Sequence, residues 1–189
     1  MLKAYKVEIK PSNEQIQIIN QTIGTCKWVY NKFIEVNQIR YKNNQKYMSG
    51  YDFSKWLNNE FIPNNPDKSW IKDSASKAIK QSIMNAHRAY QDAFKKQKGF
   101  PKFKKKQSIG SYYLIGSIHC ERHRIKLPKL GWVKLKEKGY IPSQNIKSAT
   151  VLKQFDRYFV SVLVEEEPRP IFKPLQTEGI GIDLGLKDT

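Results

Sequence analysis

Cysteine is scarce in this chain: Cys26 and Cys120 are the only two among 189 residues. They stand far apart and neither belongs to a CxxC pair, so a zinc ribbon or a disulfide framework is not encoded. No segment approaches the roughly 18 apolar residues of a membrane-spanning helix, and no signal-peptide pattern opens the chain. We therefore expect a cytoplasmic or nucleoid-associated protein without a membrane partner, in which any metal ion is held by oxygen.

Acidic residues are also few, with 17 Asp and Glu against 34 Lys and Arg and a formal net charge of +17. A surplus of this size destabilises the compact state by self-repulsion unless a polyanion shares its field. Nucleic acid is the natural polyanion for a chain that has no membrane-spanning segment. The composition therefore predicts a nucleic-acid-binding protein.

The apolar residues are first spaced as in helices and, after Gly99, alternate as in strands. A strand is predicted over residues 2–10, followed by a helix over 13–40 that Ser12 and Gln15 cap. Gly24 inside this helix costs up to about 1 kcal/mol relative to alanine, which indicates a close helix contact or a bend. A second helix is predicted from Asp52 to Pro63.

The third predicted helix follows Asp73, and its apolar stripe is Ala75, Ile79, Ile83, Ala86, Tyr90 and Ala93. Polar side chains lie off this stripe, among them Lys77, Lys80, Gln81 and Asn85. With Tyr51, they have the donors and acceptors to contact a DNA groove, but they are also ordinary surface residues of a basic helix. The residues alone leave both interpretations open.

Five short strands are predicted after Gly99, over residues 112–115, 124–127, 132–135, 146–155 and 157–164. They form a small, mainly antiparallel sheet or barrel. The strand over 2–10 has no other partner, so we expect it to join this sheet, with the helices inserted between them. The fold class is therefore α+β.

A basic stretch without any acid runs from Phe94 to Lys106. Lysines neutralise phosphates, and exposed aromatic rings stack on unpaired bases. The phenylalanines have the alternative role of anchoring a solvated loop to the core. The candidate contact residues are Lys95, Lys96, Lys98, Phe100, Lys102, Phe103, Lys104, Lys105 and Lys106.

Two other groups suggest metal chemistry. His119, Cys120 and His123 match no complete ligand set, so we interpret them as a polar turn between strands. Asp183 stands in the apolar pattern Gly-Ile-Asp-Leu-Gly, where a divalent cation is one way to compensate a buried carboxylate. Hydrolysis by two metals needs further carboxylates, and Asp188 is a weak second candidate. A related pattern holds phosphates in actin-like ATPases.

Seven blocks of the sequence form a further pattern, namely Leu2-Lys-Ala-Tyr-Lys-Val7, Gly24-Thr-Cys-Lys-Trp-Val-Tyr-Asn31, Phe100-Pro-Lys-Phe103, Leu127-Pro-Lys-Leu-Gly-Trp132, Ile146-Lys-Ser-Ala-Thr150, Val162 to Glu166, and Gly181-Ile-Asp-Leu-Gly-Leu-Lys-Asp188. In this order, they make the chain similar to the TnpB (OrfB) family, the transposon-encoded relatives of type V CRISPR nucleases. The blocks are spread over the whole chain.

The resemblance implies a wedge-like β-barrel (1–10 and 107–170) interrupted by a helical recognition lobe (11–106), whose C-terminal segment is basic. A linker and the first strand of an incomplete RuvC-like domain of RNase H fold follow (171–189). The implied partners are a guide RNA and double-stranded target DNA with an adjacent motif, which Tyr51, Lys77, Lys80 and Gln81 help to read. Asp183 matches the first RuvC carboxylate, a Mg²⁺ ligand.

Because the remaining carboxylates of the family lie downstream, we expect this bacterial or archaeal chain to bind nucleic acid without cleaving it. Three alternatives stay open. The chain is a part of a complete enzyme, a naturally truncated repressor or RNA-binding module, or a DNA-binding transposase accessory protein that needs no RNA.

Overall fold

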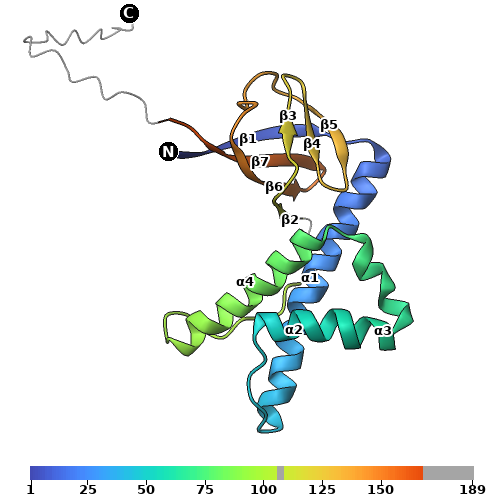
Figure 1. The fold of residues 1–189 in the computed structure, drawn as a ribbon, viewed down its shortest axis with the longest axis vertical. Helices are drawn as coiled ribbons and strands as arrows, with labels where there is room; N and C mark the ends of the chain where they lie inside the picture. The colour runs from blue at the N-terminus through green and yellow to red at the C-terminus, as the bar shows by residue number, and fades with distance from the viewer. Residues whose placement is uncertain (106–108, 168–189) are drawn as a thin grey trace, which may run out of the picture.

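A seven-stranded antiparallel sheet lies at one end of the molecule and the helices lie at the other (Figure 1). The computed structural model describes residues 1–105 and 109–167. The helices are α1 (Asn13–Lys42), α2 (Gly50–Trp56), α3 (Ile62–Asn64) and α4 (Ser76–Phe94). The strands are β1 (Leu2–Lys10), β2 (Ile109–Leu114), β3 (His119–Cys120), β4 (Arg124–Leu127), β5 (Gly131–Leu135), β6 (Ile146–Gln154) and β7 (Arg157–Glu165). The α+β prediction is therefore confirmed.

The strand order is β2-β6-β7-β1-β5-β4-β3. Strand β1 pairs with β7 from Leu2 opposite Glu165 to Ile9 opposite Tyr158, and its last residues pair with β5. The prediction that residues 2–10 join the later strands is confirmed. The order begins at β2 and ends at β3, and no pairing among residues 1–105 and 109–167 joins these two strands into a closed barrel.

Helix α1 connects the two parts of the molecule. The predicted capping box is present, since Ser12 and Gln15 exchange hydrogen bonds. The Gln15 amide also donates to the carbonyls of Leu130 and Trp132, which fixes the start of the helix on the sheet. A β-carbon at Gly24 would meet no atom within 4 Å, so no close helix contact explains this glycine.

The hydrophobic core divides into two clusters along α1. Ile19 and Ile23, in its first half, are buried with the sheet residues. Val29 and Phe33, in its second half, are buried with residues of α2 and α4. Alternate residues of β7, including Tyr158, face the sheet core as predicted.

The second helical segment begins two residues earlier than predicted. Ser49 caps α2 by accepting a hydrogen bond from the backbone of Asp52, so the helix begins at Gly50. After α2 the chain continues through a π-helical turn, η1 (Leu57–Phe61), into α3. Pro63 lies in the first turn of α3, where proline is tolerated, and the helix ends one residue later, at Asn64, in agreement with the predicted end at Pro63 and the turn that follows it. The 3₁₀ segment η2 (Pro66–Asp73) then leads to α4.

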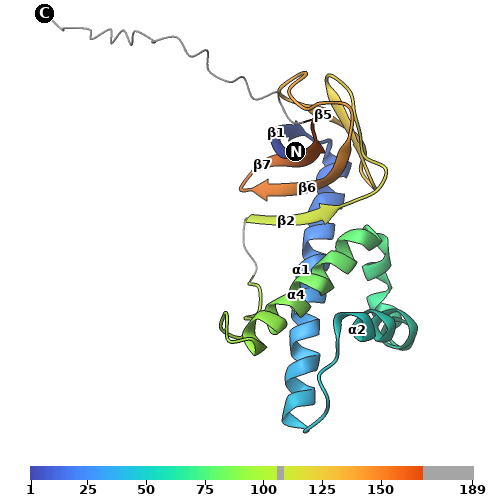
Figure 2. The ribbon, with the colours of Figure 1, turned by 60° about the vertical axis from the view of Figure 1, so that its left-hand side comes forward.

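Strand β2 is the edge of the sheet that lies nearest the helices (Figure 2). A β-carbon at Gly110 of β2 would come within 2.5 Å of the Ile23 side chain on α1. Any larger residue at this position would force the Ile23 side chain to shift. Strand β3 was not predicted: His119 and Cys120 pair with β4, and the turn is confined to the residues between the two strands.

Candidate nucleic-acid interface

One side of α4 carries the polar residues that the sequence singled out. Lys77 and Lys80 are exposed, while the opposite side of the helix is buried at Ala78, Ile83 and Ala86. The start of α2 packs on α4, and the Lys80 ammonium lies 5.9 Å from the ring centroid of Tyr51. The structure therefore brings Tyr51 and Lys80 together.

The basic stretch begins where α4 ends and returns along α1. Lys96 adopts a left-handed backbone conformation with φ of 56°, which turns the chain back. The side chain of Asn31 on α1 then holds Lys104 from both sides, since it donates to the Lys104 carbonyl (3.0 Å) and accepts from its N–H (2.8 Å). Sequence reasoning gave Asn31 no such role.

The Lys104 side chain is exposed but packs against an aromatic ring. Its ammonium lies 4.0 Å from the ring centroid of Tyr30, in a cation–π contact. Desolvation by the surrounding protein lowers the pKa of this lysine. Lys104 is thus held in place before any ligand arrives.

A polar hollow of about 240 Å³ joins helix α4, the basic stretch and the sheet. Gln81 and Asn85 of α4 line it and are linked by a hydrogen bond of 2.9 Å. Lys104 reaches it from the basic stretch. Ser111, Tyr113 and Thr150 line it from β2 and β6. Two candidates 23 positions apart in the sequence, Gln81 and Lys104, therefore meet at one site.

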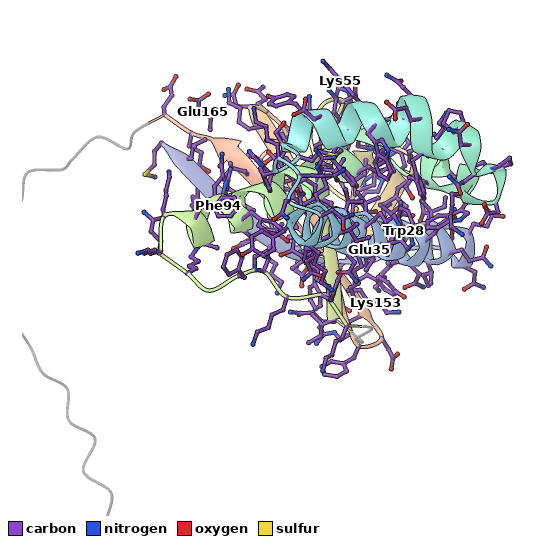
Figure 3. The ribbon with its side chains drawn as sticks, turned by 90° about the horizontal axis from the view of Figure 1, so that it is seen from below. Trp28, Glu35, Lys55, Phe94, Lys153 and Glu165 are labelled. Carbon is purple, nitrogen blue, oxygen red and sulfur yellow. The ribbon has the colours of Figure 1, made fainter. Side chains whose placement is uncertain are left out.

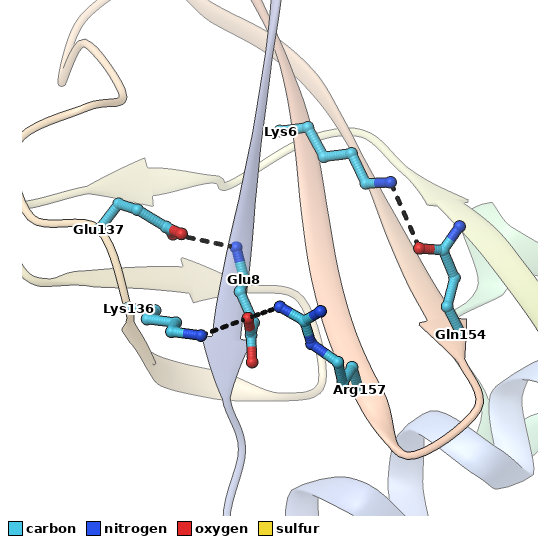
Figure 4. A network of polar contacts seen from close by, with 6 residues as sticks. All are labelled: Lys6, Glu8, Lys136, Glu137, Gln154 and Arg157. Atoms are coloured by element: carbon cyan, nitrogen blue, oxygen red, sulfur yellow. Dashed lines mark hydrogen bonds and ion pairs between the residues drawn. The ribbon is translucent and has the colours of Figure 1, made fainter.

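Charge is balanced differently on the sheet and along the basic stretch. On the sheet, the Glu8 carboxylate binds both Arg157 and Lys136 (Figure 4). These partners, Arg157 foremost, lower the pKa of Glu8 to about 2. In the described part of the basic stretch, Lys98 alone has a carboxylate partner, Asp92 at 2.8 Å. The other lysines there, which form no ion pair with a carboxylate of the described residues, are Lys95, Lys96, Lys102, Lys104 and Lys105.

The phenylalanines of the stretch are anchored but remain exposed. The Phe100 ring contacts Tyr90 and Phe94, with centroids 6.2 and 6.1 Å away. Its side chain is nevertheless 67% exposed, and Phe103 is 49% exposed. Anchoring and stacking on a ligand are therefore compatible roles for Phe100.

Three candidates lie outside the described residues, namely Lys106, Asp183 and Asp188. Within residues 1–105 and 109–167, no group of three or more His, Cys, Asp or Glu is placed to hold a metal ion. The Cys120 thiol there is buried, and burial raises its pKa. Over the same residues, no helix is long and apolar enough to cross a membrane.

The chain is similar to several known proteins. Residues 1–46 match the model of a helix-turn-helix domain of OrfB proteins. The chain is 28% identical over 187 residues to the "Putative RNA-guided DNA endonuclease InsQ" of Escherichia coli, covering 98% of this chain and 46% of that protein. It is 24% identical over 197 residues to a protein of the same description from Streptomyces pristinaespiralis, covering 97% and 46%. A "Virulence protein VsdF" of Salmonella dublin is 27% identical over 113 residues, covering 56% and 95%.

This chain thus spans a little under half the length of the two endonuclease relatives. The segment that matches the helix-turn-helix model is built from strand β1 and the single helix α1. The next helix, α2, begins only at Gly50. In this structure the matched segment therefore contains no pair of helices joined by a turn.

Proposed function

We propose that this chain, which is similar to two putative RNA-guided DNA endonucleases, is a transposon-associated OrfB (TnpB) protein and binds a guide RNA and a DNA motif for such an endonuclease. The main support for the proposal is the unpaired positive charge of the basic stretch. It is free of acid, it is fixed to α1 by Asn31, and its lysines, apart from Lys98, have no carboxylate partner within the described residues. Such a row of cations suits a phosphate backbone.

In this proposal the two nucleic acids are bound by two elements, α4 and the basic stretch, which meet at the polar hollow. Gln81 and Asn85 offer amide groups, which bind base edges in DNA grooves, and Lys77 and Lys80 flank them with positive charge. We assign α4 and Tyr51 to the DNA motif and the basic stretch to RNA. The sheet would form the wedge and the helices the recognition lobe. Asp183 would be the first Mg²⁺ ligand of a RuvC-type site.

The test is the salt dependence of RNA binding. RNA that co-purifies with the chain from its host is sequenced and then used as the probe. Replacing Lys102, Lys104 and Lys105 together by glutamine removes three phosphate contacts. The slope of log affinity against log salt concentration is then expected to fall by about 2, since each contact to a single strand contributes about 0.7.

A matched variant controls for net charge. Lys68, Lys136 and Lys147 are each held by a carboxylate, and their triple change to glutamine alters the charge of the protein by the same amount. This control is expected to keep the slope of the unmodified protein. An equal loss in both variants would mean that the basic stretch makes no specific contact, and recovery of no discrete RNA would refute the guide-RNA proposal.

A further inference from the structure

An aromatic groove of about 590 Å³ lies between the C-terminal ends of α1 and α4. Its lining includes Tyr41 and Tyr47 from the α1 side, and Tyr90, Phe94 and Phe100 from the α4 side. Phe94 lies near the end of α4, well away from Trp28 in the other part of the helical core (Figure 3). The volume is within the range of pockets that enclose small organic molecules.

Four of the five rings of the groove, those of Tyr47, Tyr90, Phe94 and Phe100, contact one another and leave surface free. The Phe94 ring contacts those of Tyr47, Tyr90 and Phe100, with centroids 5.3, 5.8 and 6.1 Å away. Even so, Phe94 is 52% exposed and Tyr41 is 83% exposed. Fixed rings with exposed surface are suited to stacking on a planar ligand.

Hydrogen bonds hold the wall that follows α1. Asn37 binds the backbone N–H and C=O of Met48, at 2.8 and 3.3 Å. Arg40 donates to the carbonyl of Lys46 at 2.7 Å, and the Tyr47 hydroxyl bonds with His87 at 2.8 Å. Because this wall is ordered in advance, a ligand does not lose affinity by ordering it.

The positive charge around the groove favours a ligand that carries phosphates. No Asp or Glu occurs from Val36 to Tyr51, a segment that includes Arg40, Lys42 and Lys46. None occurs from Ala93 to Lys105, on the other side of the groove. A second copy of this chain, with its own charge of +17, would be repelled, whereas a strand with phosphates would be attracted.

We propose that the aromatic groove binds an unpaired base of a single-stranded RNA. The base stacks on Phe100 and Phe94, and its phosphates lie against the flanking lysines. Gln38 and Gln45 line the groove, and their side chains make no hydrogen bond with the described part of the chain, so they are available to a base edge or a ribose 2′-hydroxyl. The inference deepens the proposed function and rests on RNA binding by this chain.

The probe is a short oligouridine RNA that carries one 2-aminopurine, whose fluorescence is quenched by stacking. Binding to the unmodified protein should quench it. Phe100→Leu keeps an apolar side chain but removes the ring, and it should reduce both the quenching and the affinity, the latter by about 5- to 150-fold, the range expected for one lost base stack. The salt slope should not change, because no phosphate contact is removed.

A second groove variant and a control outside the groove test the same assignment. Tyr41→Leu alters a side chain that is 83% exposed, so it leaves the core intact and should still weaken binding. Phe155→Leu, in the turn between β6 and β7, alters a phenylalanine that is 65% exposed outside the groove and should bind as the unmodified protein does.

Normal affinity and quenching in both Phe100→Leu and Tyr41→Leu would overturn the groove assignment. If the triple lysine variant then still lowers the salt slope, RNA binding by the basic stretch stands and only the groove inference falls. An oligonucleotide of the same sequence made as DNA tests whether the groove prefers an unpaired base of RNA to one of DNA. Equal quenching and equal losses with DNA would overturn the assignment to RNA.

Discussion

Replacement of Asn37 by alanine tests whether side-chain hydrogen bonds hold the wall of the aromatic groove. The Asn37 side chain is 4% exposed and makes three hydrogen bonds. One goes to the Phe33 carbonyl, which keeps its helical partner. The other two satisfy the backbone N–H and C=O of Met48. Alanine leaves these two groups without a protein partner.

The magnitude follows from the burial of Met48. A buried donor or acceptor that loses its partner costs about 1–3 kcal/mol. Since Met48 is half-buried, water replaces part of what is lost. We therefore expect Asn37→Ala to lower the free energy of unfolding by about 2–3 kcal/mol, and to speed hydrogen exchange at the Met48 amide.

The assay is urea denaturation combined with hydrogen exchange. Asn58→Ala is the matched control, since Asn58 is exposed and donates only to the carbonyl four residues earlier, Ser54, at 2.8 Å. It should change stability by less than about 0.5 kcal/mol. The reasoning would be refuted by an Asn37→Ala variant that is as stable as this control and exchanges the Met48 amide no faster than the unmodified protein.

Two further predictions concern stability. Gly24→Ala should raise the free energy of unfolding by about 1 kcal/mol in urea, because the β-carbon enters open space inside a helix; a destabilised variant would show that α1 needs glycine there. Burial lowers the pKa of His87 below its usual 6.5, so the unfolded chain takes up the proton first as the pH falls. The melting temperature should therefore drop on acidification below about pH 6.5, and less steeply in His87→Gln; parallel profiles would exclude His87 as the cause.

Much of the fold could be predicted because its signals are local. The alternation of Tyr5, Val7 and Ile9 and the capping box at Ser12 each lie within a few residues, and both are found in the structure. The start of α2 had a local signal too, since Ser49 stands three residues before Asp52 in the pattern of an N-cap. Strand β3 has only two residues, too short for a periodicity to appear.

The site was less predictable because distant segments form it. The lysines and phenylalanines of the basic stretch form a run that the sequence shows directly. The hydrogen bonds between Lys104 and Asn31, far away on α1, could not be predicted from it. The polar hollow and the aromatic groove likewise combine side chains from segments many residues apart, as with Tyr41 and Phe100. Sequence spacing gives no distance between such segments.

The basic stretch lines both the aromatic groove and the polar hollow. Phe100 lines the aromatic groove, and Lys104 reaches the polar hollow only four residues later. Four residues span at most about 14 Å, a distance that a few nucleotides of a bound strand also cover. Asn31 fixes the end of this segment to α1, and the ring contacts of Phe100 fix its beginning to α4. Under the proposals above, one strand of a few nucleotides would therefore reach from the groove to the hollow along this short, anchored segment.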